Sequence, residues 1–193
     1  MRNLLVLYGS YRPDRLGIRL ADYLMRRLAE RGNGVELVDA KALAIPLLEM
    51  RVKDWPEGEV PEPFATLSAK FAACDGFVLV AGEYNWGVQP GLKNLVDHFG
   101  AEFKWRPAAV TSYSTGRTGG SRSVQAWLPS LVTLGMAPVP ATITCGEIDR
   151  TLDALAQPQG AGGAALERSF EAFAPVLEWW VDAAKAQRAA TKS

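Results

Sequence analysis

The sequence predicts an α/β protein in which a five-stranded parallel sheet lies between two layers of helices. Three observations support this fold class. Several apolar runs are continuous, as in strands that are buried on both faces. Segments with apolar residues at every third or fourth position lie between these runs and are typical of amphipathic helices. The connections are short, so successive strands are expected to be joined through helices by right-handed crossovers.

Five strands are expected along the chain. The first, third and fourth are continuous apolar runs and are expected at the centre of the sheet. The second is shorter and mixed, as expected nearer an edge, and the fifth alternates and carries a proline at its second residue. In chain order the strands are Leu4–Tyr8, Val35–Val38, Phe77–Ala81, Ala108–Tyr113 and Val139–Thr144.

Five helices are expected between and after the strands. The first has leucines at every fourth position from Leu16 to Leu28, arginines on its other face, and glycines at its end. The others are expected over 64–74, 90–99, 120–134 and 164–187, the last with a kink or restart at Pro175. Two segments, 46–63 with four prolines and 157–163 rich in Gly and Ala, are expected to be loops. With no repeat and 193 residues, the chain 1–193 is expected to form one domain.

The composition is that of an ordinary globular domain, with 21 basic and 21 acidic side chains. Because the formal charge is zero, no general attraction to nucleic acid or to anionic lipid is expected. No stretch approaches the roughly 20 apolar residues of a membrane span. The apolar run near the N-terminus is too short for a secretory signal. We therefore expect a cytoplasmic protein with no nucleic-acid or membrane partner.

Several classes of site are excluded by missing motifs. Cys74 and Cys145 form no CxxC pair and His98 is the single imidazole, so we expect no metal site, and we interpret both cysteines as small buried residues in a reduced compartment. The chain contains no GxxxxGK[ST], GxGxxG or GxSxG motif. His98 is expected far from the strand ends, which argues against a serine hydrolase triad.

Three loops at the carboxyl ends of predicted strands form the candidate site. Ligands of open α/β sheets bind beyond these ends where the chain order reverses, and strands 1 and 3 flank that point if the order is 2-1-3-4-5. The first loop, residues 9–17, offers the Ser10 hydroxyl, the Arg12 and Arg15 guanidiniums and the start of a helix. This combination favours a monoester phosphate, and the alternative is a helix start with solvated arginines.

The other two loops indicate a flat ligand. Residues 82–91 place two aromatic rings and an amide between glycines, and Tyr84 and Trp86 either border a ligand or cap the core or a subunit interface. Residues 112–120 contain three glycines that would let the backbone approach a ring closely. Together, a phosphate cradle on one side and a flat slot on the other have the shape of FMN.

These loops resemble the motifs of the NADPH-dependent FMN reductase family, flavodoxin-like proteins that also include quinone and azo reductases. Gly9–Arg15 (GSYRPDR) resembles the family's G-S-x-R-P-x-R phosphate loop. Glu83–Asn85 with Pro90–Asn94 and Asp97 resembles its P-E-Y-N…PG-LKN-x-x-D signature, and Ser112–Gly120 is similar to its third loop. The resemblance covers residues 3 to about 145 and implies a flavodoxin-like three-layer sandwich.

The resemblance implies FMN as cofactor and NADPH or NADH as co-substrate. The first loop would hold the phosphate, the second would line the isoalloxazine, and the third would contact its pyrimidine side. The implied cofactor-binding residues are Ser10, Arg12, Arg15, Gly17, Glu83, Tyr84, Asn85, Trp86, Ser114, Thr115 and Gly116. No side chain is expected to be catalytic, since the flavin carries the chemistry. Gly82, in place of the usual proline, and Trp86–Val88 depart from the family pattern.

The implied function is hydride transfer from NAD(P)H through FMN to a flavin, quinone, azo or similar small acceptor by a ping-pong mechanism. Arg117 is either a contact for the phosphate of the nicotinamide nucleotide or a solvated loop residue. A flavodoxin-like electron carrier is the alternative, although such carriers are usually acidic, and a non-redox dimer scaffold is a third hypothesis. A homodimer or homotetramer is expected, with the apolar residues of 46–63 either in the interface or packed on their own domain.

Overall fold

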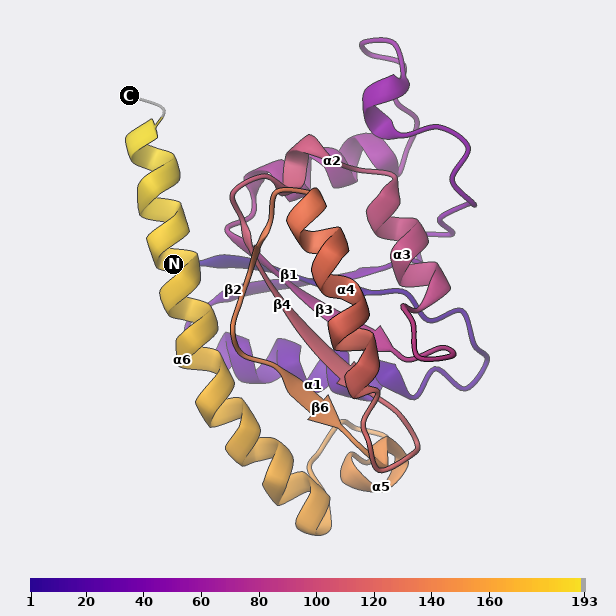
Figure 1. Ribbon diagram of the computed structural model, residues 1–193, viewed down its shortest axis with the longest axis vertical. Helices are drawn as coiled ribbons and strands as arrows, with labels where there is room; N and C mark the ends of the chain where they lie inside the picture. Colours follow the sequence, from indigo (N-terminus) through magenta and orange to yellow (C-terminus); the bar gives the residue numbers. More distant parts are fainter. Residues whose placement is uncertain (192–193) are drawn as a thin grey trace.

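The computed structural model describes residues 1–191 as a three-layer sandwich around a parallel sheet (Figure 1). The strands are β1 (Asn3–Tyr8), β2 (Gly34–Asp39), β3 (Gly76–Gly82), β4 (Pro107–Tyr113), β5 (Ala137–Pro138) and β6 (Ile143–Cys145). Their order is β2-β1-β3-β4-β5, β6 also pairs with β4, and all the pairings are parallel. The predicted fold class and strand order are confirmed.

The helices cover both faces of this sheet. They are α1 (Gly17–Glu30), α2 (Phe64–Ala73), α3 (Pro90–Asp97), α4 (Ser121–Thr133), α5 (Ile148–Thr151) and α6 (Gly160–Thr191), with short 3₁₀ turns η1 (Val52–Asp54) and η2 (Ala101–Phe103). Because side chains alternate along a strand, Val6 of β1 packs with α1 and α6, whereas Leu5 and Leu7 pack with α2, α3 and α4. Cys74 and Cys145 are both buried with free thiols.

The prediction of one continuous strand over 139–144 is wrong, because the structure divides this edge into β5 and β6. From the point where β4 pairs with β5 to the point where it pairs with β6, the segment that joins β5 to β6 spans two residues more than β4 does. Pro140 lies in the intervening segment and has no N–H group to donate to the ladder. Instead, the Thr142 hydroxyl donates to the carbonyl oxygen of Val110 at 2.6 Å.

The last helix also differs from the prediction. It begins at Gly160, inside the segment 157–163 that was expected to be a loop, and it runs unbroken through Pro175, so no restart occurs (Figure 1). The glycines at its start serve close packing, since a Cβ on Gly163 would lie 2.6 Å from the backbone of Pro158. Among residues 1–191, no helix combines the length and the apolar character needed to cross a membrane.

The segment 46–63 lies outside the sandwich, as the sequence predicts, and η1 is its short helical turn. The side chain of Asn94 on α3 anchors its start, donating to the carbonyl oxygen of Pro46 at 2.7 Å and accepting from the N–H of Leu48 at 2.9 Å. The same carbonyl lies 3.2 Å from Nε2 of His98. The side chain of Leu47 remains exposed.

Candidate functional site

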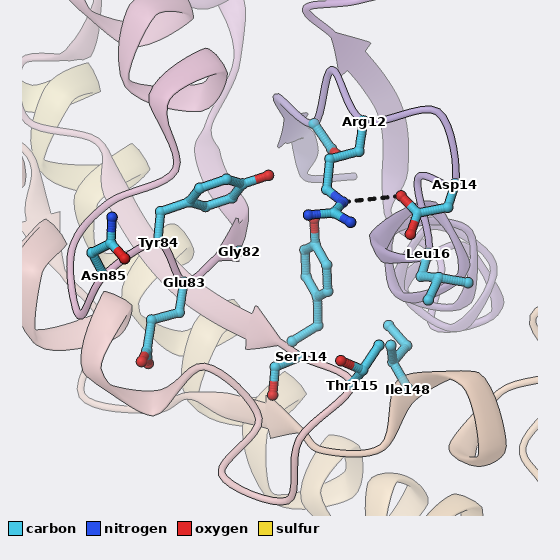
Figure 2. Close-up of a pocket in the computed structure, with 12 residues that line it drawn as sticks. Arg12, Asp14, Leu16, Gly82, Glu83, Tyr84, Asn85, Ser114, Thr115 and Ile148 are labelled. Atoms are coloured by element: carbon cyan, nitrogen blue, oxygen red, sulfur yellow. Dashed lines mark hydrogen bonds and ion pairs between the residues drawn. The ribbon is translucent and has the colours of Figure 1, made fainter.

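A cavity of about 310 Å³ opens at the carboxyl edge of the sheet, where β1, β3 and β4 end (Figure 2). Its walls come from the three predicted loops and from the start of α5. The lining residues are Ser10, Arg12, Asp14, Leu16, Gly82, Glu83, Tyr84, Asn85, Tyr113, Ser114, Thr115 and Ile148. The structure thus brings together Ser10, Arg12, Glu83, Tyr84, Asn85, Ser114 and Thr115 of the predicted set, but it does not place Arg15, Gly17, Trp86 or Gly116 on the cavity wall.

Glycine allows the first and second loops to meet. A Cβ on Gly91, in the first turn of α3, would lie 2.3 Å from the carbonyl oxygen of Gly9, and one on Gly9 would lie 2.2 Å from the N atom of Leu92. Pro90 begins α3, a position where its missing N–H group costs no hydrogen bond. The end of β1 and the start of α3 therefore touch through their backbones, which holds the first and second loops together.

Ser10 follows β1 and precedes α1, and its side chain is 1% exposed. Within residues 1–191 its Oγ makes no hydrogen bond of good geometry, although it lies close enough to the Tyr8 and Tyr113 hydroxyls to favour a lower pKa for each. A buried hydroxyl whose hydrogen bonding is incomplete can take a further partner, so its place in the cavity wall suits a ligand oxygen. The adjacent start of α1 provides the partial positive charge that favours phosphate. These features fit the phosphate end of FMN.

Arg12 and Asp14 form an ion pair on the cavity wall. Nε of Arg12 donates to Oδ1 of Asp14 at 3.0 Å, and Tyr84 points toward Arg12 from the opposite loop (Figure 2). This hydrogen bond raises the pKa of Arg12 and lowers the pKa of Asp14. Sequence reasoning missed Asp14 as a lining residue, although an acidic residue inside a predicted phosphate loop was a visible signal.

Arg15 does not line the cavity. Its Nη2 donates to the carboxylate of Asp39 at the end of β2, and its guanidinium lies 5.1 Å from the centre of the Tyr8 ring. The Tyr8 hydroxyl donates to the carbonyl oxygen of Arg15 at 3.2 Å, which holds the start of α1 against β1. The Arg15 guanidinium is therefore engaged by Asp39 and Tyr8, although its Nε has no hydrogen-bond partner among residues 1–191.

Tyr113, at the end of β4, forms part of the cavity wall. Burial raises the pKa of its hydroxyl, which accepts a hydrogen bond from Nε2 of Gln89 at 3.1 Å. Gly17 lies behind the ring, and a Cβ there would lie 2.1 Å from Cζ of Tyr113. Gly17 thus supports the site by leaving room for this ring. The sequence placed Tyr113 in the third loop but provided no signal that its ring points inward.

The second loop turns sharply at Asn85 and Trp86, whose φ angles are +49° and +66°. Two backbone hydrogen bonds join Tyr84 and Gly87 across this turn, at 2.8 and 3.3 Å. Positive φ at both central residues is the pattern of a type I′ turn, in which Asn is favoured and Trp is strained. The turn keeps Asn85 on the cavity wall, while the Trp86 side chain is 70% exposed and lies off it.

Glu83 and Trp86 both contact the start of α4. The Glu83 carboxylate accepts a hydrogen bond from the N–H of Arg122 at 3.0 Å, so it satisfies one free N–H group of the first helical turn. The Arg122 guanidinium lies 4.4 Å from the centre of the Trp86 ring. These contacts attach the second loop to α4.

The third loop is attached to the segment that follows β6. The carbonyl oxygen of Gly116 accepts hydrogen bonds from the Ser114 hydroxyl at 2.9 Å and from the N–H of Glu147 at 3.1 Å. Gly116 therefore lies behind the wall that Ser114 and Thr115 form. Arg117 is exposed outside the cavity lining.

The parallel sheet has the order 2-1-3-4-5, and the cavity lies at its switch point, where the chain order reverses between β1 and β3. Together with a phosphate-type loop after β1, this arrangement defines a flavodoxin-like mononucleotide-binding domain. The chain belongs to the NADPH-dependent FMN reductase family, whose sequence profile matches residues 2–148. The predicted family is therefore confirmed. The part of the chain from residue 149 onward, which includes α6, lies outside the match.

Individual relatives agree with this assignment. The NAD(P)H-dependent FMN reductase LOT6 of Saccharomyces cerevisiae is 30% identical over 130 residues, which cover 61% of this chain and 66%, just under two thirds, of the yeast protein. Among solved structures, the NAD(P)H:acceptor oxidoreductase FerB of Paracoccus denitrificans matches with a TM-score of 0.67 at 20% identity, covering 96% of this chain and 98% of that chain. A flavodoxin of Pseudomonas aeruginosa matches with a TM-score of 0.55 at 16% identity, covering 91% and 99%. At these identities the two solved structures show the shared fold.

Proposed function

We propose that this protein is an FMN-dependent NAD(P)H oxidoreductase that reduces a small acceptor such as a flavin, a quinone or an azo compound. One observation carries the proposal. The buried Ser10 hydroxyl, whose hydrogen bonding is incomplete, and the loop residues Tyr84 and Asn85 line a single cavity at the point of the sheet where the chain order reverses. Membership of the FMN reductase family supports FMN as the ligand of that cavity.

The residues present fit this cofactor. Ser10, Arg12 and the N–H groups at the start of α1 would hold the phosphate, and the backbone at Tyr84 and Asn85 would border the ring, with Ser114 on its pyrimidine side. When bound, FMN would supply the two-electron chemistry that links NAD(P)H to the acceptor. The protein's part is to bind and orient both partners, so no side chain needs to act as an acid or base.

Titration with FMN, followed by steady-state assays, tests this function. We expect FMN to bind, NADPH or NADH to be oxidised only when FMN and an acceptor are present, and double-reciprocal plots to give parallel lines, since donor and acceptor use the cavity in turn. Intersecting lines would contradict the ping-pong scheme. FMN binding without oxidation of the nicotinamide would instead support an electron carrier, and absence of FMN binding would overturn the proposal.

We also propose that the protein assembles as a homodimer or homotetramer. The exposed side chains of Leu47 and Met50 on the segment that projects from the sandwich support this assembly, because exposed apolar clusters commonly mark contact surfaces (Figure 1). Sedimentation of the wild type and of a variant with Leu47→Ser and Met50→Ser tests the proposal. A monomeric wild type would contradict it.

A further inference from the structure

Both arginines of the loop that is proposed to hold a phosphate are paired with carboxylates. Arg12 is paired with Asp14 at 3.0 Å, and Arg15 is paired with Asp39. The Lys41 ammonium donates hydrogen bonds to the carbonyl oxygens of Arg12 and Tyr11 in this loop, at 3.3 and 3.4 Å. Each arginine of the loop therefore already has a carboxylate partner within the protein.

The two pairs differ in position. The pair of Arg15 and Asp39 is mostly buried and lies off the cavity wall. The side chains of Arg12 and Asp14 are 63% and 51% exposed, and both line the cavity (Figure 2). Of the two carboxylates that line the cavity, Asp14 is the one paired with the proposed phosphate ligand Arg12, whereas Glu83 accepts from the N–H of Arg122. The hydrogen bond from Arg12 lowers the pKa of Asp14, so this carboxylate is charged at neutral pH.

We propose that Asp14 sets the affinity of the cavity for the phosphate group, so that FMN is a dissociable ligand and not a tightly held one. This inference rests on the proposed function. A phosphate held by Ser10 and by the Nη groups of Arg12 would share this guanidinium with Asp14, a second anion on the same cavity wall, which weakens binding. The contribution of the ring is unaffected, because Tyr84 and Asn85 lie on the opposite loop.

The substitution Asp14→Asn tests this inference, since it removes the charge and keeps the shape. Flavin fluorescence during titration with protein gives dissociation constants for FMN and for riboflavin, which lacks the phosphate. We expect the FMN constant of the variant to fall about five- to tenfold, and the riboflavin constant to stay unchanged. The gain should shrink as salt is added, because the Asp14 side chain is about half exposed and its charge is screened.

Asp54→Asn is the matched control. Asp54 accepts a hydrogen bond from Nε of Arg51 at 3.0 Å, the same distance as in the Arg12–Asp14 pair, and these side chains are 50% and 42% exposed. Asp54 lies outside the cavity lining, so neither flavin should bind this variant differently. Asp14→Glu retains the charge and should keep FMN affinity near that of the wild type.

Other outcomes separate this inference from the proposed function. If Asp14→Asn weakens FMN binding or leaves it unchanged, Asp14 orients Arg12 or is irrelevant, and the inference is overturned. Equal tightening of FMN and riboflavin would also overturn it, because the effect would not depend on the phosphate. If the wild type binds neither flavin, the proposed function fails, and the inference fails with it.

Discussion

Nε2 of Gln89 donates a hydrogen bond to the Tyr113 hydroxyl at 3.1 Å, and this contact joins the start of α3 to the end of β4 beside the cavity. Gln89 is 1% exposed. Gly82 provides the necessary space, because a Cβ there would lie 3.0 Å from Nε2 of Gln89 and 3.2 Å from the Tyr113 hydroxyl. The proline usual at this position of the family motif would crowd both groups. Glycine at position 82 therefore leaves room for the hydrogen bond between Gln89 and Tyr113.

Tyr113→Phe should destabilise the protein by about 1–3 kcal/mol, because the Gln89 amide then stays buried without its acceptor. Urea unfolding measures the loss. The double variant Tyr113→Phe with Gln89→Met removes both polar groups and should cost less than the sum of the single changes. Strict additivity would show that the hydrogen bond contributes nothing.

Gly17→Ala should destabilise the protein by about 1–3 kcal/mol and weaken FMN binding, since the new methyl group overlaps the Tyr113 ring. Thermal unfolding and flavin titration measure both effects. Gly100→Ala is the control, because no atom lies within 4 Å of a Cβ there, and we expect a change below about 0.5 kcal/mol. Equal effects at the two glycines would contradict a specific role for Gly17.

Ser10→Ala should weaken FMN binding about tenfold or more, because hydrogen bonds to charged groups contribute about 1.5–3 kcal/mol. Riboflavin binding should not change. The urea midpoint should change little, since the substitution removes a buried hydroxyl that makes no hydrogen bond of good geometry within the protein. Loss of stability with unchanged FMN affinity would assign Ser10 a purely structural role.

We expect the folded protein to lose stability in acid because of the hydrogen-bonded Glu178 on α6. Burial alone would raise its pKa, but hydrogen bonds from Arg31 at 2.8 and 2.9 Å and from Asn33 at 2.9 Å hold the pKa below its ordinary value of 4.5. A lowered pKa in the folded state adds stability above about pH 4.5, and this stability is lost as the pH falls through the folded-state pKa.

The variant Glu178→Gln isolates this contribution. It should be less stable than the wild type at pH 7 by about 1–3 kcal/mol, and the difference should shrink as the pH is lowered to about 3. Urea unfolding at a series of pH values measures it. Parallel stability curves for the two proteins would show that the titration of Glu178 is not coupled to folding.

The sequence by itself determined the fold class, the strand order, the family and the three loops that meet at the cavity. Continuous apolar runs and glycine-bounded loops are local features of the chain, and they leave few topologies open. The same local features were ambiguous at residues 139–144, where Pro140 interrupts an otherwise regular strand, and at 157–163, where glycines that pack a helix closely look like a flexible loop.

Only the tertiary structure decided which side chains face the cavity. It turned Arg15 toward Asp39 and left Arg12 beside Asp14, and it pressed Gly17 against Tyr113. Each of these outcomes depends on the direction of a side chain and on the partners within a few ångströms of it. Neither is encoded in residue spacing, because the competing partners come from different strands and loops.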